Sequence, residues 1–360
     1  MKILVTGAAG FIGGQLWHTL WKRGDEVVGI DNFSYGNPDN LKFDDHDFGA
    51  EVRRMDIRDK AGMLALFEAE KFDVVYNIAG IAPLPDCQSD PVQAIEVNTL
   101  GLVNLLEAGR RTGIKQLVQA STNAMYENET EFPTVEGKFN PPTLIYPNTK
   151  YCGERFAQSF ADTYGMTVTC LRFANVYGPH IDCLRKPEFH SDGNQRRDYI
   201  YVDDLIALAL RVVEHPQKGF DAVNVSSNQS YSVRELYAIA NRLMGKNIEA
   251  KYCPSSHYWA KYPELYGGAY GIKPEILDHE VNKFSQCDNT HAREVYGWQP
   301  QVDIETGLGR VIEAEKLSPQ ATDEGSVNGA TLLRKIAQAM AAGRPSSGAA
   351  RHLPPQGKAF

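Results

Sequence analysis

The residues best suited to chemistry in this sequence are a hydroxyl, a phenol and an ammonium group: Thr122, Tyr146 and Lys150. Tyr146 and Lys150 are four residues apart, and Pro147 suits the first turn of a helix, so both side chains can share one helical face. Thr122 ends a segment that begins with Leu117 and Val118 between two glutamines, and residues 116–120 read as a strand. We therefore expect the three side chains to meet where that strand ends and the helix begins.

A phenol beside an ammonium group suggests proton removal from a substrate hydroxyl. Free tyrosine titrates near ~10, so a phenolate at neutral pH requires its pKa to fall by roughly 3, which is about 4 kcal/mol. The positive charge of Lys150 favours that phenolate, and Thr122 would orient the reacting hydroxyl by a hydrogen bond. Because the chain has 17 tyrosines, a Tyr-x-x-x-Lys match alone means little. Its position after a strand of a nucleotide-binding fold is what gives it meaning.

A glycine-rich turn near the N-terminus indicates such a fold. Residues 2–5 are an apolar run of strand length, residues 6–14 follow without a spacer, and a helical pattern continues to residue 24. Gly7 and Gly10 let the backbone approach a diphosphate, and Gly13 lets the helix pack on the strand. One such motif is weak evidence, and a glycine turn without a ligand is the alternative.

An acidic residue at the end of the second predicted strand supports the dinucleotide site. The run 25–30 reads as that strand and ends at Asp31, close to the roughly 20-residue offset expected of a ribose-binding acid. A carboxylate there accepts hydrogen bonds from a ribose 2′-hydroxyl and repels a 2′-phosphate, which favours NAD over NADP. We therefore expect Tyr146 to remove a proton while a carbon-bound hydride passes to NAD.

Strands and helices alternate through the first half of the chain, which predicts an α/β fold with a Rossmann-type, doubly wound parallel sheet. We expect a dinucleotide-binding domain at 1–178, to which the chain returns at about 198–226. Segments 179–197 and 227–318 would form a smaller, irregular substrate-binding lobe. Residues 319–360 read as a partly disordered tail with one amphipathic helix near 332–340.

Composition excludes several classes of partner. The net charge is −8 and no basic block precedes the tail, so nucleic acid and anionic membranes are not expected partners. No apolar run could span a bilayer, and the chain enters a strand at once without a signal-peptide pattern. The six cysteines form no Cys-x-x-Cys pair and the histidines lack ligand spacing, so we expect no metal site and a cytoplasmic location.

Seven motifs together give the chain a specific resemblance. They are residues 6–13 (TGAAGFIG), 31–32 (DN), 56–57 (DI), 121–122 (ST), 146–150 (YPNTK), 171–179 (LRFANVYGP) and 192–204 (DGNQRRDYIYVDD). Over about residues 1–318 the chain resembles an extended short-chain dehydrogenase/reductase of the NAD-dependent nucleotide-sugar epimerase/dehydratase family.

The resemblance implies roles for particular residues. The family's catalytic triad matches Thr122, Tyr146 and Lys150. The substrate would be bound by Asn175 and Arg197 at its diphosphate and by Thr122 at its sugar. The cofactor-binding set would be Gly7, Gly10, Phe11, Ile12, Gly13, Asp31, Asn32, Asp56, Ile57, Ala79, Tyr146 and Lys150. The helices that begin near Asp90 and Thr149 resemble those that pair two subunits as a four-helix bundle, so a homodimer is implied.

The reaction follows from what stands after Thr122. In this chain the two residues after Thr122 are Asn123 and Ala124, whose side chains can act neither as acid nor as base. Dehydratases of this family carry an acidic pair at these two positions. Decarboxylating relatives carry a glutamate at the position of Ala124. A 4-epimerase needs no further base. We therefore expect an NAD-dependent nucleotide-sugar 4-epimerase that oxidises C4 transiently. A dehydratase, decarboxylase or other sugar-modifying enzyme using Glu127 or Glu129 is the alternative, and a non-catalytic NAD-binding protein is a third.

The chain departs from the family pattern in three places. Glu127 stands where relatives usually have glycine, and the connection from Pro179 to Asp192 is much shorter than in relatives. Asp278 stands where an arginine often binds the second phosphate, which leaves Lys283 or Lys273 as substitutes. A carboxylate near a diphosphate would repel it, so we expect nucleotide binding to be weaker or differently arranged.

Overall fold

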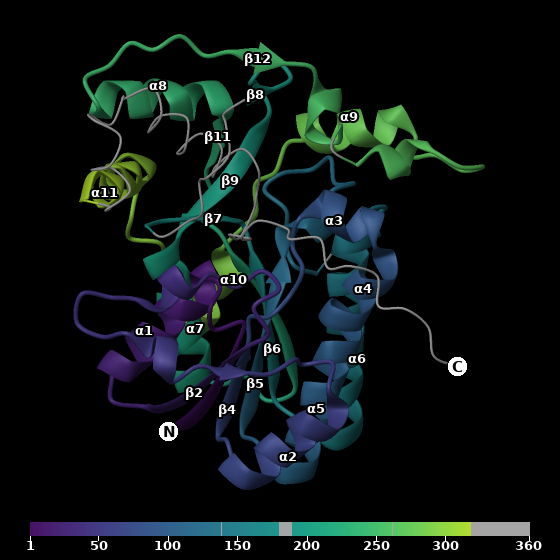
Figure 1. Cartoon of the computed structure of the whole chain (residues 1–360), viewed down its shortest axis with the longest axis vertical. Coiled ribbons are helices and arrows are strands. Elements are labelled where there is room, and N and C mark those ends of the chain that lie inside the picture. The colour runs from purple at the N-terminus through teal and green to yellow at the C-terminus, as the bar shows by residue number, and fades with distance from the viewer. Residues whose placement is uncertain (138, 180–188, 261, 318–360) are drawn as a thin grey trace.

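A seven-stranded parallel sheet forms the centre of the molecule in the computed structural model, which describes residues 1–137, 139–179, 189–260 and 262–317. Its strand order is β3-β2-β1-β4-β5-β6-β10, the doubly wound order in which the chain runs outward from β1 in both directions (Figure 1). The strands are β1 (Lys2–Thr6), β2 (Glu26–Asp31), β3 (Arg53–Arg54), β4 (Val74–Asn77), β5 (Gln116–Thr122), β6 (Val168–Phe173) and β10 (Phe220–Val225). The predicted fold class is confirmed.

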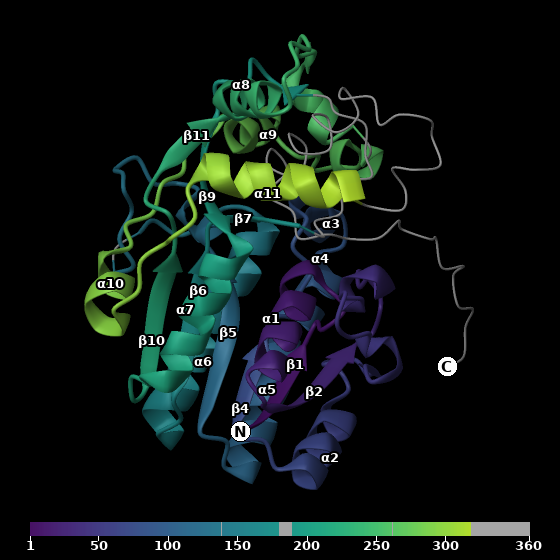
Figure 2. The ribbon, with the colours of Figure 1, turned by 90° about the vertical axis from the view of Figure 1, so that its left-hand side faces the viewer.

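Helices cover both faces of this sheet. One face carries α1 (Phe11–Lys22) and α7 (Val202–Glu214), and the other carries α2 (Lys60–Glu70), α5 (Gly101–Thr112) and α6 (Ile145–Tyr164), as Figures 1 and 2 show. Ile3 and Val5 of β1 belong to one buried apolar cluster and Leu4 to another. Successive residues of a strand point to opposite faces, so a strand buried on both sides reads as the continuous apolar run seen in the sequence.

The helix expected to begin near Asp90 forms, but it is interrupted. It consists of α4 (Pro91–Ile95), a π-helical segment (Glu96–Leu100) and α5, and a further helix, α3 (Leu84–Ser89), precedes it. A π-helical turn rotates the side chains within it relative to a regular helix, and such turns are frequent at functional sites. Here the turn holds Asn98, which is buried against the first turns of α6.

A smaller lobe lies beyond the carboxyl ends of the sheet strands (Figure 1). Its strands form one sheet in the order β11-β9-β7 and a second, two-stranded sheet of β8 and β12. They are β7 (Asn175–Tyr177), β8 (Phe189–His190), β9 (Arg196–Tyr201), β11 (Ser230–Ser232) and β12 (Tyr252–Cys253). Thus β9 pairs within the lobe, whereas β10 joins the central sheet.

The helices of the second half are more regular than the proline- and glycine-rich sequence predicts. They are α8 (Val233–Leu243), which begins with a capping box of Ser232 and Glu235, α9 (Pro274–Asn282), α10 (Thr290–Tyr296) and α11 (Ile304–Leu317). The α10 helix packs beside β10 of the central sheet (Figure 2). The shortened connection at 180–188 and the tail from 318 to 360 lie outside the described residues.

The described parts of the chain contain neither a membrane-spanning helix nor a cluster of possible metal ligands. No helix there is long and apolar enough to cross a membrane. Nor do three side chains of the types that bind metal ions gather at one point among the same residues.

Candidate active site

Two adjoining cavities open at the carboxyl ends of the central strands, where ligands bind in doubly wound sheets. The first cavity lies over the glycine turn and β2, and the second lies between the sheet and the smaller lobe. Both include the same wall, which consists of Phe11, Ile12, Ala82, Ser121, Tyr146 and Phe173. Tyr146 therefore faces both cavities, as a group that acts between a cofactor and a substrate must.

The glycine turn of the first cavity leaves no room for side chains. Gly7 has a φ of +65°, and a Cβ there would lie 2.7 Å from the backbone nitrogen of Ala79. A Cβ on Gly13 would lie 2.0 Å from the carbonyl oxygen of Gly7. Gly7 and Gly10 line the cavity, whereas Gly13 lies beneath the turn and lets α1 approach it. The turn thus fits the diphosphate of a dinucleotide at the N-terminus of α1.

Asp31 organises the loops around this cavity. Its Oδ2 accepts a hydrogen bond of 3.0 Å from the backbone N–H of Ala9, and its Oδ1 accepts one of 2.7 Å from Phe33. Burial raises the pKa of this carboxyl, and the two backbone N–H groups oppose that rise. Asp31 lines the cavity and keeps acceptor capacity for a ribose hydroxyl.

The remaining residues of the predicted cofactor set gather on the same side of the cavity. Asn32 donates a hydrogen bond of 2.9 Å to Asp56, which also pairs with Arg58 at 2.8 Å. Partial burial raises the pKa of Asp56, but the hydrogen bonds from Arg58 and Asn32 outweigh this effect and lower it to about 2. Ile57 and Ala79 also line the cavity. An anionic, hydrogen-bonded rim of this kind suits an adenosine without a 2′-phosphate.

The predicted triad lies around the shared wall, with Tyr146 in the wall, Thr122 lining the second cavity and Lys150 lining the first. Tyr146 and Lys150 lie in the first two turns of α6, and Thr122 ends β5. Lys150 donates a hydrogen bond of 2.9 Å from Nζ to the carbonyl oxygen of Ala120. Gly80 lets this ammonium group approach, because a Cβ on Gly80 would lie 3.0 Å from Nζ. The order and spacing of these residues in the sequence predicted this meeting.

Burial acts on Tyr146 and Lys150 in opposite directions. It raises the pKa of Tyr146 to about 12, although a hydrogen bond with Thr122 opposes the rise. Burial also lowers the pKa of Lys150 to about 8. Without bound ligands the phenol is therefore kept protonated, and an additional positive charge beside it is needed to make it a base at neutral pH.

Asn98 is a buried residue that the sequence analysis did not select. Its side-chain amide donates to the carbonyl of Ile81 at 2.9 Å and to Thr149 Oγ1 at 3.0 Å, and its oxygen accepts from the Ile81 N–H at 2.8 Å. It thereby joins the strand-end loop of the first cavity to the turn of α6 between Tyr146 and Lys150. Its place on the π-helical turn has no signature in a single sequence.

A buried ion pair lies next to the strand end that carries Thr122. Arg172 and Glu154 approach to 2.6 Å with side chains only 5% and 3% exposed. Ser121, next to Thr122, donates a hydrogen bond of 2.5 Å to Glu154, and Arg172 donates one of 2.8 Å to the hydroxyl of Tyr126. Together, these contacts hold the end of β5 against α6.

The second cavity contains both residues predicted to bind the substrate diphosphate. Asn175 donates a hydrogen bond of 2.8 Å to the carbonyl of Asp198. The Arg197 guanidinium donates to the carbonyls of Glu280 at 2.8 Å, Val281 at 3.2 Å and Lys283, at the end of α9. Its positive charge thus lies at the carboxyl end of a helix, where cations are favoured, and at the wall of the cavity.

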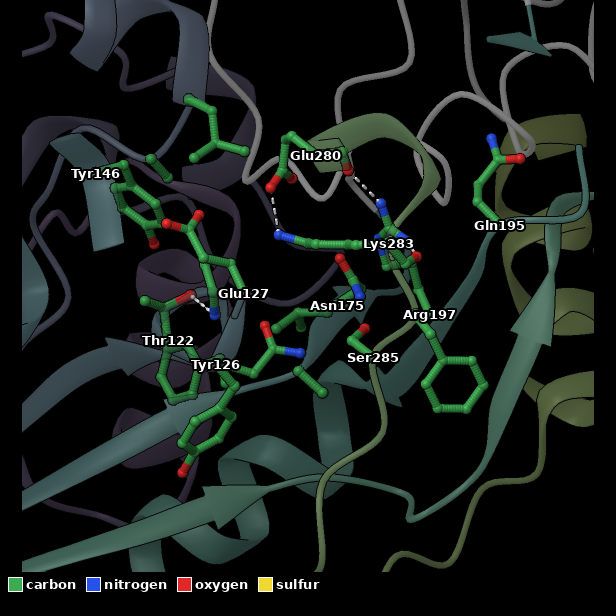
Figure 3. Close-up of a pocket in the computed structure, with 18 of the residues that line it drawn as sticks. Thr122, Tyr126, Glu127, Tyr146, Asn175, Gln195, Arg197, Glu280, Lys283 and Ser285 are labelled. Atoms are coloured by element: carbon green, nitrogen blue, oxygen red, sulfur yellow. Dashed lines mark hydrogen bonds and ion pairs between the residues drawn. The ribbon is translucent and has the colours of Figure 1, made fainter. Parts of the chain in front are cut away.

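Lys283 is the further cation of this cavity. It pairs with Glu280 at 2.6 Å, and the two side chains are only 10% and 8% exposed (Figure 3). Asp278, which stands in place of the family's arginine, is exposed and receives a hydrogen bond of 2.8 Å from Ser255. Asp278 does not line the cavity, so the repulsion of a diphosphate expected from its carboxylate is not a feature of this site. Of the two lysines that could replace the family's arginine, Lys283 lines the cavity and Lys273 does not.

Two polar atoms of the second cavity have no protein partner. Gln195 Oε1 and Ser285 Oγ are buried and make no hydrogen bond among the described residues, and both residues line the cavity (Figure 3). Buried polar atoms without partners are costly, so a polar ligand in this cavity would satisfy them. Gln195 lies within the motif at 192–204, but its type and position alone did not mark it.

Comparison with known proteins agrees with this geometry. Residues 3–226 match the NAD dependent epimerase/dehydratase family. The chain is 31% identical over 332 residues to a UDP-glucose 4-epimerase of Mycolicibacterium smegmatis, which covers 87% of this chain and 98% of that protein. It is 26% identical over 335 residues to a UDP-glucuronate 4-epimerase of Thermodesulfobacterium geofontis, with coverage of 87% and 95%.

A solved structure supports the same assignment. The crystal structure of a UDP-glucose 4-epimerase of Thermus thermophilus in complex with NAD superposes with a TM-score of 0.73 at 27% identity, covering 88% of this chain and 100% of that one. The resemblance stated from the motifs is confirmed, and the glycine turn and acidic rim of the first cavity fit the cofactor. The chain therefore belongs to the NAD dependent epimerase/dehydratase family of enzymes, with NAD as its cofactor.

Proposed function

We propose that the chain is a nucleotide-sugar 4-epimerase. The observation that carries this proposal is the position of Tyr146 in the wall between the two cavities, one helical turn from Lys150 and hydrogen-bonded to Thr122. Relatives named as UDP-glucose and UDP-glucuronate 4-epimerases support the reaction type. The triad assignment and the substrate remain part of the proposal.

Gly7, Gly10 and Asp31 would hold NAD in the first cavity, where the cofactor would supply a reversible hydride acceptor for C4 of the sugar. In this scheme Thr122 holds the C4 hydroxyl by a hydrogen bond and Tyr146 removes its proton. Lys150 stabilises the resulting phenolate through its positive charge, while its hydrogen bond to Ala120 keeps the ammonium group in place. Asn175, Arg197 and Lys283 would bind the diphosphate, and Gln195 and Ser285 would provide polar contacts to the rest of the substrate.

The positions after Thr122 favour epimerisation over elimination. Asn123 and Ala124 line the second cavity but supply neither acid nor base. The one observation that favours a dehydratase is Glu127, a carboxyl group in the same cavity. Glu129, the other acid considered from the sequence, does not line it.

The test is to incubate the purified, NAD-loaded protein with UDP-, GDP-, CDP- and dTDP-sugars and identify products by mass spectrometry and proton NMR. We expect a C4 epimer of unchanged mass, which disappears in the Tyr146→Phe variant. The matched control is Tyr270→Phe, because Tyr270 is 98% exposed and lines neither cavity. A product lighter by water would identify a dehydratase, and binding of NAD without any reaction would support a non-catalytic role.

We further propose that two copies pair through α4, α5 and α6. Apolar side chains on the outer surface of this layer are unusually exposed: Val92 is 65%, Ile95 50%, Leu100 48% and Phe156 47% exposed. Burying such surface contributes roughly 25 cal/mol per Å², so an apolar face of this kind favours association. The dimer predicted from the family would cover these side chains.

We also propose which segments bind the substrate and where in the cell the protein is located. The segments 179–197 and 227–318 would bind the substrate, and their contribution of Gln195, Arg197, Lys283 and Ser285 to the second cavity supports this. A reducing cytoplasm is consistent with the five described cysteines, all of which are free thiols.

A further inference from the structure

Glu127 places a negative charge in the second cavity. The residue follows directly on the short helical turn Asn123–Tyr126 after β5, and it is only 6% exposed. It lines the same cavity as Thr122 and Tyr146. Figure 3 shows its side chain turned into the cavity, toward Tyr146.

Among the residues that the structure describes, one oxygen of this carboxylate accepts hydrogen bonds and the other accepts none. Oε1 accepts hydrogen bonds from the backbone N–H groups of Thr143 and Leu144, the latter at 2.8 Å. These two residues immediately precede α6, so the contact positions the start of the helix that carries Tyr146. Oε2 has no hydrogen-bond partner among the described residues, which leaves it available to a ligand.

The charges around Glu127 do not cancel its effect. Burial raises the pKa of its carboxyl, Lys283 opposes the rise, and Glu280 adds to it. Lys283 is engaged by Glu280 at 2.6 Å, so its positive charge is already shared with a nearer carboxylate. A second negative group brought beside Glu127 would therefore meet two carboxyl groups, Glu127 and Glu280, that share the single ammonium group of Lys283.

This inference rests on the proposed 4-epimerase activity, because the C5 substituent of a sugar is adjacent to the reacting C4. If Tyr146 and Thr122 contact the C4 hydroxyl, that substituent lies within a few ångströms of the groups around them. A hydroxymethyl group at C5 donates a hydrogen bond to Oε2, whereas a carboxylate there repels it. We propose that Glu127 determines the substrate class, selecting nucleotide hexoses with an uncharged C5 substituent over nucleotide uronates.

The experiment compares UDP-glucose with UDP-glucuronate on the NAD-loaded protein at pH 8, by calorimetric binding and by NMR of interconversion. The wild type should bind UDP-glucose more tightly, by on the order of a hundredfold for two carboxylates a few ångströms apart in a partly buried site. The Glu127→Gln variant keeps the acceptor for Thr143 and Leu144 but removes the charge, so the preference should fall to within about tenfold. Glu131→Gln, an exposed residue of the same loop, should keep the wild-type preference.

Each result separates this inference from the proposed function. Equal binding of the two ligands by the wild type, or an unchanged preference in Glu127→Gln, overturns the role of Glu127 even if a hexose is epimerised. If neither sugar is interconverted, the proposed epimerase activity fails, but the wild-type binding ratio still decides whether Glu127 discriminates. That ratio is measured on the unaltered protein, so the inference stays falsifiable if Glu127→Gln fails to fold.

Discussion

Lys150 and Ala120 are joined by a hydrogen bond of 2.9 Å from the buried ammonium to the backbone carbonyl, which ties α6 to the end of β5. The contact keeps the positive charge at the first cavity, one helical turn from Tyr146. It also uses one of the three ammonium hydrogens, so the remaining two are available for a cofactor ribose or water.

The first prediction concerns the pH dependence of the reaction. Because burial lowers the pKa of Lys150 to about 8, its positive charge is lost as the pH rises through that value, and stabilisation of the Tyr146 phenolate is lost with it. We expect kcat/KM to fall above about pH 8. Lys150→Met should lower kcat/KM by roughly 100- to 10,000-fold, and its residual activity should lack this fall.

The matched control for the lysine is Lys115→Met, because Lys115 is an exposed residue paired with Asp73 on the surface. Its pH profile should match that of the wild type. A descending limb near pH 8 that persists in Lys150→Met would assign that titration to another group.

The second prediction concerns the choice of cofactor. Asp31→Ala removes the acceptor for the Ala9 and Phe33 N–H groups and the expected partner of the ribose. NAD affinity should drop by roughly ten- to a hundredfold, since hydrogen bonds to a charged group contribute about 1.5–3 kcal/mol. NADP affinity should fall less or rise, because the repulsion of its 2′-phosphate disappears.

Calorimetric titration of both cofactors measures this ratio. Asp39→Ala serves as the control, since Asp39 is exposed and forms an ion pair with the exposed Lys42. An unchanged NAD-to-NADP ratio in Asp31→Ala would remove Asp31 from cofactor discrimination.

The third prediction concerns the buried ion pair behind the triad. Arg172→Met leaves Glu154 buried without its partner, and the free energy of unfolding should fall by about 3–5 kcal/mol. The double variant Glu154→Met with Arg172→Met should recover much of that loss, because no charge is left unpaired.

Urea unfolding at pH 7 measures these differences. Arg155→Met, an exposed arginine on the same helix as Glu154, should change stability by no more than about 0.5 kcal/mol. If Arg172→Met is as stable as this control, the pair contributes nothing to holding β5 against α6.

The fourth prediction concerns assembly. Phe156→Glu places a charge on the exposed apolar face of α6 and should convert a dimer to a monomer at micromolar concentration. Light scattering coupled to size-exclusion chromatography gives the mass directly. Tyr270→Glu, on an exposed residue outside this face, should leave the dimer intact, and a monomeric wild type would refute the pairing.

Much of the site could be predicted because its residues lie in short, ordered motifs. The glycine turn, Asp31, Thr122 and the Tyr146–Lys150 pair each stand next to an element whose apolar pattern is strong. The regularity of the second half could not be predicted in the same way. The helix α9 begins at Pro274, in a region where prolines, glycines and tyrosines indicate loops, and it packs against the short helical segment Ser255–Tyr258.

Local sequence by itself determined the parallel sheet, the cofactor-binding turn and the order of the triad, because each depends on patterns within a few residues. The tertiary structure decided which distant charges share the second cavity. It brought Glu127 near Lys283, paired Lys283 with Glu280, directed Arg197 to the end of α9, and left Asp278 outside. These relationships join segments far apart in the chain, and their electrostatic effect depends on burial and distance, which no local pattern encodes.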